Sequence, residues 1–264
     1  MKKILKRLKK AVNKADKKTF FVYLTLRVLV ILCLVRELIN GNYQNAILCI
    51  LSLILFLLPA FVERTFKIDF PSVLEIIILL FIFSAEILGE INNFYGIFAN
   101  FDNILHTING FLCASIGFSL IYLLNENIES FKLSPLFVSI FAFCFSMTIG
   151  IFWEFFEYGM DNLFNLDMQK DEYIYNINTV VLDLEFDNNV INIKDIDKTV
   201  LYDKNNEELI KLDGYLDIGL NDTMKDLIVN FVGALIFSVF GYLYIMNKDK
   251  YNIAGKFLTK KAKE

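Results

Sequence analysis

The stretch PLFVSIFAFCFSMTIGIFWEFFEYGMD (135–161) is a long apolar run that ends among carboxylates. Its apolar part is long enough to cross a bilayer as a helix, for which roughly 20 mostly apolar residues are needed. Glu154, Glu157 and Asp161 follow at spacings of three and four residues, so a continuing helix would carry all three on one face. The stretch predicts a membrane helix whose last turns present an acidic stripe to another part of the protein.

The composition of the whole chain assigns the class of protein. Of its 264 residues, 56% are hydrophobic, 27 are Phe and only three are Pro. A water-soluble domain rarely has such a composition. The chain is therefore predicted to be an all-α polytopic membrane protein.

Six apolar stretches are long enough to span the membrane, near residues 20–39, 44–61, 72–91, 103–124, 135–158 and 223–245. Each is expected to be an α-helix, because backbone polar groups in lipid must be satisfied within the segment. The predicted organisation is a basic segment 1–18, helices one to five within 19–161, an insertion 162–221, the sixth helix within 222–246 and a basic tail 247–264.

The distribution of Lys and Arg predicts the orientation in the membrane. Residues 1–18 contain nine basic residues and one acidic residue, and residues 247–264 contain six and two. Because Lys and Arg concentrate in cytoplasmic segments, both termini are predicted to be cytoplasmic and residues 162–221 extracytoplasmic. Apolar residues at helical spacing within 1–18 predict either an amphipathic helix on the inner leaflet or a simple positive-inside anchor.

The insertion 162–221 differs from the spans in composition. Residues 161–222 hold fifteen acidic and five basic residues. Apolar residues alternate in VVLDLEF (180–186), VINIKDI (190–196) and ELIKL (208–212), a pattern typical of short, half-buried strands. We expect a small β-rich extracytoplasmic domain. No disulfide is expected within it, because all four Cys (33, 49, 113 and 144) fall in the spans.

The ionisable residues of the spans gather at one depth. Most lie toward the outer end of their span, so a pocket that opens outward would bring them together. A charge left in lipid costs roughly 3 kcal/mol, and these side chains must therefore face protein, water, one another or a metal ion. They are Arg27, Arg36, Glu86, Glu90, Asp102, His106, Glu154, Glu157, Asp161, Asp222 and Asp226, together with the polar Asn230.

The only His of the chain, His106, lies in this group. One imidazole with several carboxylates suits Zn, Mn or Fe, although no spacing matches a specific metal-binding motif. Protonated carboxylates, or pairing with an Arg, are the other ways to compensate the acidic charge. The predicted ligands of a possible divalent metal ion are His106, Glu86, Glu154 and Asp226.

Two interpretations of the polar residues stay open. Glu90, Asp102, Asp161 and Asp222 are either part of the pocket or solvated helix ends and N-caps. The deeper residues form either a functional pocket or a structural polar network that holds the helices together. In the functional interpretation, His106, Glu154 and Asp226 are the candidate catalytic residues, and Arg27, Arg36, Asn230 and Glu157 are candidates for substrate binding.

Several stretches together resemble one family. They are SAEILGE (84–90), FDNILHTINGFLCASIGFSL (101–120), FCFSMTIGIFWEFFEYGMD (143–161), LDMQKD (166–171) and GYLDIGLNDTMKDLIVNFVGA (214–234). From them the chain is identified as a member of the YjdF-like family of bacterial integral membrane proteins. The resemblance covers residues 20–246 and implies a fold and a multi-pass protein of the bacterial cytoplasmic membrane, but no activity.

A second, partial resemblance is to VanZ-like membrane proteins, which are associated with glycopeptide resistance. Those proteins carry an Arg in a short connection between their last two spans, where this chain has the insertion and only Lys170 as a candidate equivalent. Recognition of an anion or lipid headgroup is therefore not carried over. The residues behind the resemblance are Asp102, His106, Glu154, Asp226, Asn230 and Gly233.

Three classes of function are compatible with these features. The first is a site at the outer leaflet that binds or processes a lipid-linked or cell-envelope substrate, with His106 and Glu154 as acid and base or as metal ligands. The second is a proton- or ion-coupled carrier. The third is a non-catalytic envelope-binding or resistance protein. Membrane lipids are expected partners, and no nucleic-acid-binding motif is present.

Overall fold

The computed structural model describes residues 16–127, 132–185 and 187–261. The predicted amphipathic segment 1–18 lies almost entirely outside these residues. The chain forms two compact units, the first comprising residues 1–150 with 226–264 and the second comprising residues 151–225. The long fifth and sixth spans each contribute to both units.

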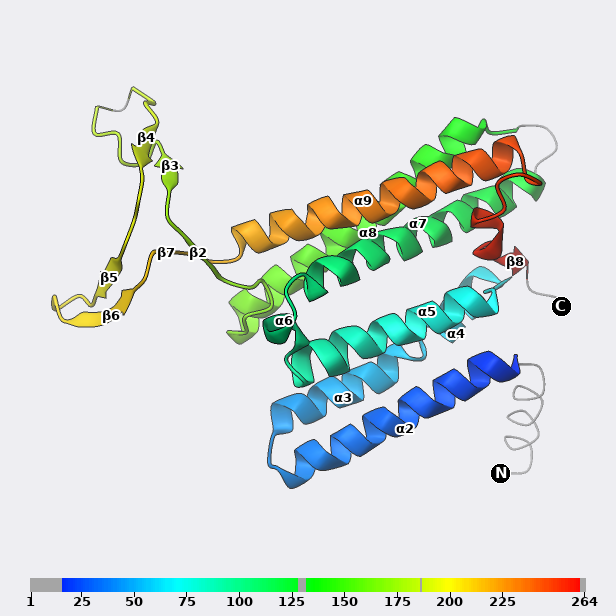
Figure 1. The fold of residues 1–264 in the computed structure, drawn as a ribbon, viewed down its shortest axis with the longest axis horizontal. Coiled ribbons are helices and arrows are strands. Elements are labelled where there is room, and N and C mark those ends of the chain that lie inside the picture. The colour runs from blue at the N-terminus through cyan, green and yellow to red at the C-terminus, as the bar shows by residue number, and fades with distance from the viewer. Residues whose placement is uncertain (1–15, 128–131, 186, 262–264) are drawn as a thin grey trace. The chain divides into compact units, whose positions relative to one another are not determined.

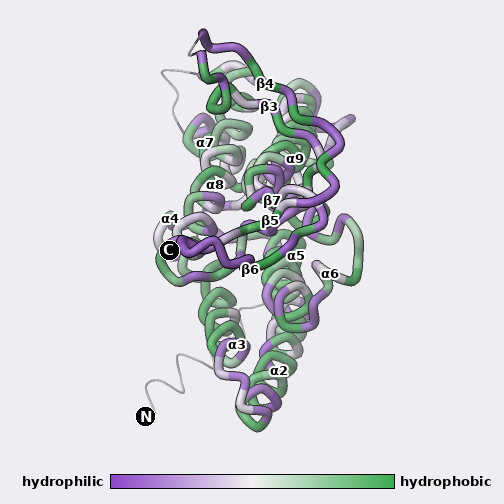
Figure 2. The backbone as a smooth tube through the Cα atoms, turned by 90° about the vertical axis from the view of Figure 1, so that its left-hand side faces the viewer, coloured by the Kyte–Doolittle hydropathy of each residue, from purple (hydrophilic) through white to green (hydrophobic). Residues whose placement is uncertain are grey.

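Six segments of the described residues are long and apolar enough to cross a membrane, as the sequence predicts. Their exposed apolar side chains provide the surface that contacts lipid, and Figure 2 shows how hydrophobic residues run along the helices. The segments α3–α4 and α5–η1 each make one span. The helices are α2 (Lys17–Ile39), α3 (Tyr43–Leu55), α4 (Leu58–Phe66), α5 (Ser72–Phe83), η1 (Ser84–Ile91), α6 (Phe94–Ile97), α7 (Phe101–Asn127), α8 (Pro135–Phe164) and α9 (Leu220–Met246) (Figure 1).

The second span is interrupted between α3 and α4. Pro59, in the first turn of α4, has no backbone N–H with which to continue the helical hydrogen bonds. The Leu57 N–H donates to the Ile54 carbonyl at 2.9 Å, and the Leu53 carbonyl accepts from Arg27 Nη2 at 3.2 Å. Arg27 therefore satisfies a backbone carbonyl at the interruption, as the water-free membrane interior requires.

Apolar side chains pack the first unit in three clusters. One joins α2, α3, α5 and η1, a second joins α7, α8 and α9, and a small third cluster connects β1 and α5 with α7. The buried members are Leu26, Val30, Cys49, Phe56, Leu79, Ile82 and Ile87 in the first, Ala114, Phe118, Tyr122, Val138, Ala142, Ala234, Phe237 and Ala254 in the second, and Ile68, Phe70, Leu74 and Leu112 in the third.

The segment after α9, predicted as a basic tail, folds back onto the helices of the first unit. A short 3-10 turn, η2 (Ala254–Lys256), precedes strand β8 (Lys260–Lys261), which pairs antiparallel with β1 (Ile68–Asp69). The Phe257 ring lies 5.2 Å from the Phe111 ring and 5.9 Å from the Phe237 ring, between centroids. Ser119 Oγ donates to the Phe257 carbonyl at 3.3 Å and accepts from the Thr259 N–H at 3.3 Å.

The second unit contains the predicted β-rich insertion. Its six strands pair in three antiparallel ladders of two strands each among the described residues. Figure 2 shows long hydrophilic stretches in this part of the chain. The pairs are β2 (Glu172–Ile174) with β7 (Tyr215–Asp217), β3 (Ile177–Thr179) with β4 (Ile191–Ile193), and β5 (Thr199–Tyr202) with β6 (Glu208–Leu212).

One of the three predicted strands is wrong. VINIKDI and ELIKL contain β4 and β6, whereas residues 180–185 of VVLDLEF form turns. Asp183 gives the reason, because its carboxylate accepts from the Glu185 N–H at 3.3 Å and from the Asn189 N–H at 2.9 Å. Such side-chain bonds to the backbone compete with the ladder bonds of a strand.

Candidate functional site

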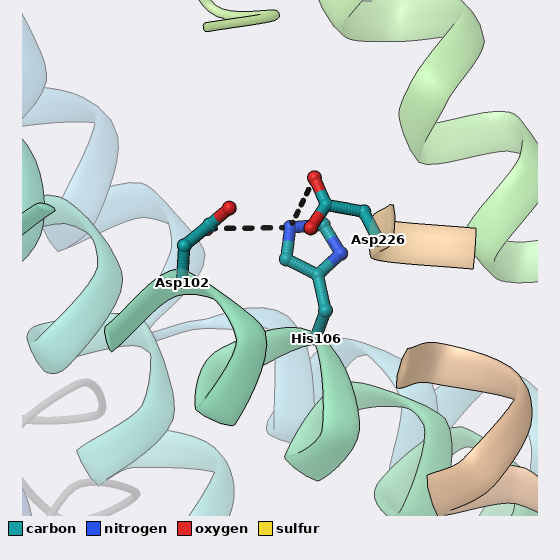
Figure 3. A group of neighbouring side chains, drawn as sticks. All are labelled: Asp102, His106 and Asp226. Atoms are coloured by element: carbon teal, nitrogen blue, oxygen red, sulfur yellow. Dashed lines mark ion pairs between the residues drawn. The ribbon is translucent and has the colours of Figure 1, made fainter. Parts of the chain in front are cut away.

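Asp102, His106 and Asp226 meet in the first unit (Figure 3). Asp102 and His106 lie one turn apart near the start of α7, and Asp226 lies near the start of α9. His106 Nε2 is 3.5 Å from Asp102 Oδ1 and 3.5 Å from Asp226 Oδ2. One imidazole nitrogen therefore faces two carboxylates that come from different helices.

Burial within this group increases from Asp102 to Asp226. The side chains of Asp102, His106 and Asp226 are 32%, 13% and 2% exposed. A carboxylate as buried as that of Asp226 needs compensation of its charge, by a cation or by a proton. A protonated His106, a metal ion at Nε2 or a proton on the carboxylate itself could supply that compensation, and Asp102 is the most accessible residue of the group.

Close packing of α7 against α9 brings the three side chains together. A Cβ atom on Gly233 would lie 2.0 Å from the Thr107 carbonyl oxygen, and one on Gly110 would lie 2.1 Å from the Asn230 carbonyl oxygen. Neither position accommodates a larger residue unless a backbone moves. Glycine at these two positions lets the helices approach each other, as small residues do in membrane bundles.

A neutral polar layer lies one turn beyond the His106 group. Asn109 Nδ2 donates to Asn230 Oδ1 at 3.3 Å, and Asn230 Nδ2 donates to Met147 Sδ at 3.6 Å. Asn230 is almost fully buried. Since a Cβ atom on Gly150 would come within 2.7 Å of Asn230 Nδ2, this amide is enclosed by α7, α8 and α9.

The ligand atoms of Asp102, His106 and Asp226 all lie within 4.8 Å of one another, so that one metal ion could bind all three. Zn–N and Zn–O bonds of about 2.0–2.2 Å in a tetrahedral site place ligand atoms about 3.4 Å apart. A direct N–H···O hydrogen bond, by contrast, is about 2.7–3.2 Å long. The two 3.5 Å separations at His106 Nε2 fit the spacing of ligand atoms around an ion, and they fit equally well two ion pairs of a protonated His106 with the carboxylates.

Comparison with protein-family models shows which family the chain belongs to. Residues 21–247 match the family described as Predicted membrane protein (DUF2238). The chain belongs to this family. It is the family that the sequence resemblance named YjdF-like, whereas the comparisons do not show the resemblance to VanZ-like proteins. No curated protein and no solved structure matches the chain.

The DUF2238 match begins within the first span and ends just after the last. It therefore includes both helices of the His106 group and the β-rich insertion. The description of the family states a membrane location and no activity, so the chemistry of the site has to be inferred from its geometry.

Glu86, predicted as a metal ligand, is buried on the π-helical segment η1. π-helical turns are rare and occur frequently at functional sites. Within the described part of the chain, however, the carboxylates grouped with the His106 nitrogen are those of Asp102 and Asp226. The structure thus assembles two of the four predicted ligands, His106 and Asp226, and adds Asp102.

The two Arg residues predicted to bind substrate make their contacts within the α2–α3 region. The Arg27 guanidinium lies 4.8 Å from the centre of the Tyr23 ring, in addition to its bond with the Leu53 carbonyl. Arg36 Nε pairs with Glu37 Oε1 at 2.7 Å. These contacts give both residues a structural role, and binding of a substrate by them stays a prediction.

Glu154 and Glu157 belong to the second unit, in the last turns of α8. Both are buried, and Glu157 Oε1 accepts a hydrogen bond of 2.8 Å from the indole Nε1 of Trp153. The predicted acidic stripe on this helix is thus turned away from solvent at these two positions. A catalytic or metal-binding role of Glu154, and substrate binding by Glu157, stay predictions.

Two further carboxylates hold the chain segment that follows α8. Asp161 accepts from the backbone N–H groups of Met168 and Gln169 at 2.6 and 2.9 Å, and Asp222 Oδ2 accepts from the Lys170 N–H at 2.7 Å. Both carboxylates therefore accept hydrogen bonds from backbone N–H groups near helix ends, which agrees with the interpretation of these residues as helix-end residues.

A pocket of about 280 Å³ lies in the second unit and is lined in part by Tyr158, Asp161, Asp167, Asp171 and Ile218. The pKa of Asp171 is raised, mainly by partial burial and then by the nearby charges of Asp167, Asp217 and Asp161. The pocket therefore has a negative potential that opposes ionisation of a further carboxylate.

Sequence reasoning left Asp102 open as a helix end and did not single out Asn109 or Met147. A signal for the first two is present, because Asp102, His106 and Asn109 follow one another at spacings of four and three residues. Asp226, Asn230 and Gly233 repeat these spacings on α9. The polar face of each span is expected to turn away from lipid and toward other helices. The sequence gives no comparable sign of a role for Met147, because a single Met in a membrane span is equally compatible with a position facing lipid and with one in the core.

Proposed function

We propose that Asp102, His106 and Asp226 bind one divalent transition-metal ion, and that the ion serves to bind or process a lipid-linked or cell-envelope substrate at the outer leaflet. The observation that carries the proposal is the pair of 3.5 Å separations between His106 Nε2 and the two carboxylates. A mixed set of one imidazole nitrogen and carboxylate oxygens favours Zn, Mn or Fe over Ca or Mg.

Three protein ligands leave coordination positions for water or substrate, as in catalytic metal sites. An ion in such a site polarises a carbonyl or phosphoryl oxygen, or lowers the pKa of a bound water molecule. Asp102 is the most exposed of the three ligands, so a substrate would approach from its side. The buried Asp226 carboxylate would fix the ion from the opposite side.

The location of the site in the membrane supports the choice of substrate. His106 and Asp226 lie five and six residues after the starts of α7 and α9, or about 8–9 Å along each helix axis. With both termini in the cytoplasm, as the Lys and Arg distribution predicts, these helix starts are on the extracytoplasmic side. A headgroup in the outer leaflet would reach this depth, whereas a cytoplasmic metabolite would not.

Elemental analysis of the purified, detergent-solubilised protein tests the metal site. The variants are His106→Ala and Asp226→Asn, and the matched control is Glu126→Gln, an exposed carboxylate at the opposite end of α7. We expect near-stoichiometric metal in the wild type and in the control, and loss of most of it in the two site variants. Glu86→Gln and Glu154→Gln then show whether the other predicted ligands contribute.

A folded wild type that holds no metal after exposure to Zn²⁺ and Mn²⁺ would overturn the proposal. His106 would then be a protonated partner of two carboxylates. Equal metal loss in the Glu126→Gln control would show that binding is not specific to the site.

A second candidate, a proton- or ion-coupled carrier, is favoured by one observation. The polar side chains continue inward from His106 and Asp226 to Asn109 and Asn230. The Phe111, Phe237 and Phe257 rings lie beyond them and would have to move to open a path. Flux of Mn²⁺ or protons into proteoliposomes, abolished in His106→Ala, is expected of a carrier and not of an outer-leaflet enzyme.

A further inference from the structure

Cys33 on α2 and Cys49 on α3 face each other across a helical hairpin, far from the His106 group in sequence. At the end of the hairpin next to the turn, Asn45 Nδ2 donates to Glu37 Oε2 at 3.2 Å. One helical turn further along each helix, four residues before Glu37 and four after Asn45, the facing positions are Cys33 and Cys49. Both cysteines belong to the same apolar cluster, Cys49 as a buried member and Cys33 packed against it.

The helices of this hairpin pack closely at the two cysteines. The buried residues of α3 are Ala46, Cys49 and Ser52, all of them small. They form one stripe at spacings of three residues, which lets α2 approach the backbone of α3. A disulfide needs Cα atoms about 4.4–6.8 Å apart, and facing positions on two helices come this close only where small residues let the helices pack closely.

The surroundings of the two sulfur atoms differ in a way that suits thiol–disulfide exchange. Arg36 Nη2 donates to Cys33 Sγ at 3.7 Å, and the Arg36 guanidinium is held by Glu37. The thiolate is the nucleophile in this chemistry, and the Arg36 guanidinium is the cationic group in contact with Cys33. Cys33 is partly exposed whereas Cys49 is fully buried. An outside disulfide therefore meets Cys33 first.

We propose that Cys33 and Cys49 form a redox-active dithiol that is oxidised by exchange with a disulfide. The Cys33 thiolate attacks one sulfur of R–S–S–R, which forms a mixed disulfide and releases RS⁻. Cys49 then loses its proton and attacks the Cys33 sulfur, which forms the Cys33–Cys49 bond and releases the second RS⁻. Two protein thiols are oxidised, one disulfide is reduced to two RSH, and the new bond joins α2 to α3.

The other two cysteines lack this arrangement and serve as the background for a test. Cys113 Sγ donates to Asn109 Oδ1 at 3.5 Å within α7, and Cys144 is exposed on α8. The experiment uses the full chain carrying Cys113→Ser and Cys144→Ser, so that Cys33 and Cys49 are its only thiols. The matched control adds Cys33→Ser and Leu34→Cys, which moves one thiol about 100° around α2.

The probe is 4,4′-dithiodipyridine, a small apolar disulfide that enters detergent micelles, with intact-protein mass spectrometry as the readout. We expect two molecules of thiopyridone released per protein and a product lighter than the dithiol by two hydrogen atoms. The Leu34→Cys control is expected to keep a pyridylthio group on each thiol that reacts. Arg36→Gln is expected to slow the first release several-fold without changing the final product.

Three results would overturn the proposal. They are a stable pyridylthio adduct on Cys33 or Cys49 of the test protein, a disulfide that forms only between two chains on a non-reducing gel, and no reaction of the folded protein. Internal oxidation of the Leu34→Cys control at the same rate would also overturn it, because the facing geometry would then be irrelevant.

Discussion

Gly110 on α7 lies so close to Asn230 on α9 that a Cβ atom on Gly110 would come within 2.1 Å of the Asn230 carbonyl oxygen. The contact is one turn from His106 and one turn from Asp226. The separation between the imidazole and the Asp226 carboxylate therefore depends directly on the packing of these two helices. A change at this contact is therefore expected to alter both the geometry of the His106 group and the stability of the first unit.

Gly110→Ala is expected to push α7 and α9 apart, to lower thermal stability and to remove any metal bound at His106. The added methyl group has to displace backbone rather than a flexible side chain. The matched control is Gly159→Ala on α8, where a Cβ atom meets nothing within 4 Å. Thermal midpoints in detergent and metal content of both variants are the measurements, and a Gly110→Ala protein as stable as the control would contradict the close contact.

Asn230→Leu is expected to destabilise the first unit by roughly 1–3 kcal/mol, because it removes the buried Asn230 amide from its bond with the partly buried Asn109. The double variant Asn109→Leu, Asn230→Leu replaces both partners by apolar groups of similar size. It is expected to recover part of the loss, which a double-mutant cycle on unfolding midpoints measures. Strict additivity of the two single effects would show that the amides do not act as a pair.

Phe257→Ala is expected to lower stability by less than the ~3–5 kcal/mol that loss of a fully buried aromatic ring costs, because Phe257 is only partly buried. Phe257 packs against both Phe111 and Phe237, so its loss also loosens the contact of the C-terminal segment with α7 and α9. Limited proteolysis after the end of α9 is the measurement, with Tyr251→Ala as a control at an exposed position of the same segment. Equal cleavage of wild type and Phe257→Ala would argue against the packed segment.

Asp171→Asn is expected to stabilise the second unit slightly at pH 7.5 and to have no effect near pH 3.5. The pKa of Asp171 is raised above its ordinary value of 3.8 by partial burial and by Asp167, Asp217 and Asp161. A raised pKa in the folded state means that ionisation opposes folding, so the penalty is absent below the unfolded pKa and is complete above the folded one. Thermal midpoints of wild type and variant across this pH range test the sign.

The pattern of hydrophobic residues determined the class and the spans of this protein. Backbone N–H and C=O groups in lipid have to form hydrogen bonds within their own segment. A single apolar stretch long enough to span the membrane therefore folds as an α-helix. The same rule did not predict the interruption between α3 and α4, where Arg27 bonds the Leu53 carbonyl. That contact joins two helices, and the sequence of either one alone does not contain it.

In the β-rich insertion the sequence by itself determined less. Apolar alternation in residues 180–186 resembles that of β6, yet the Asp183 carboxylate binds nearby N–H groups and turns the chain instead. Alternation of apolar and polar residues indicates which face of a strand would be apolar. Whether side-chain hydrogen bonds replace the hydrogen bonds between strands depends on the position of the neighbouring backbone. Only the folded chain decides that competition.

The sequence also determined which residues of the candidate site share a helix face. Asp102 and His106 on α7, and Asp226 and Asn230 on α9, follow from spacing alone. Tertiary structure decided that these two faces meet, through the contacts at Gly110 and Gly233, and that Arg27 and Arg36 contact α3 and Glu37 instead. Periodicity fixes the angle of a side chain about its own helix axis, but the choice of neighbouring helix depends on the packing of the whole bundle.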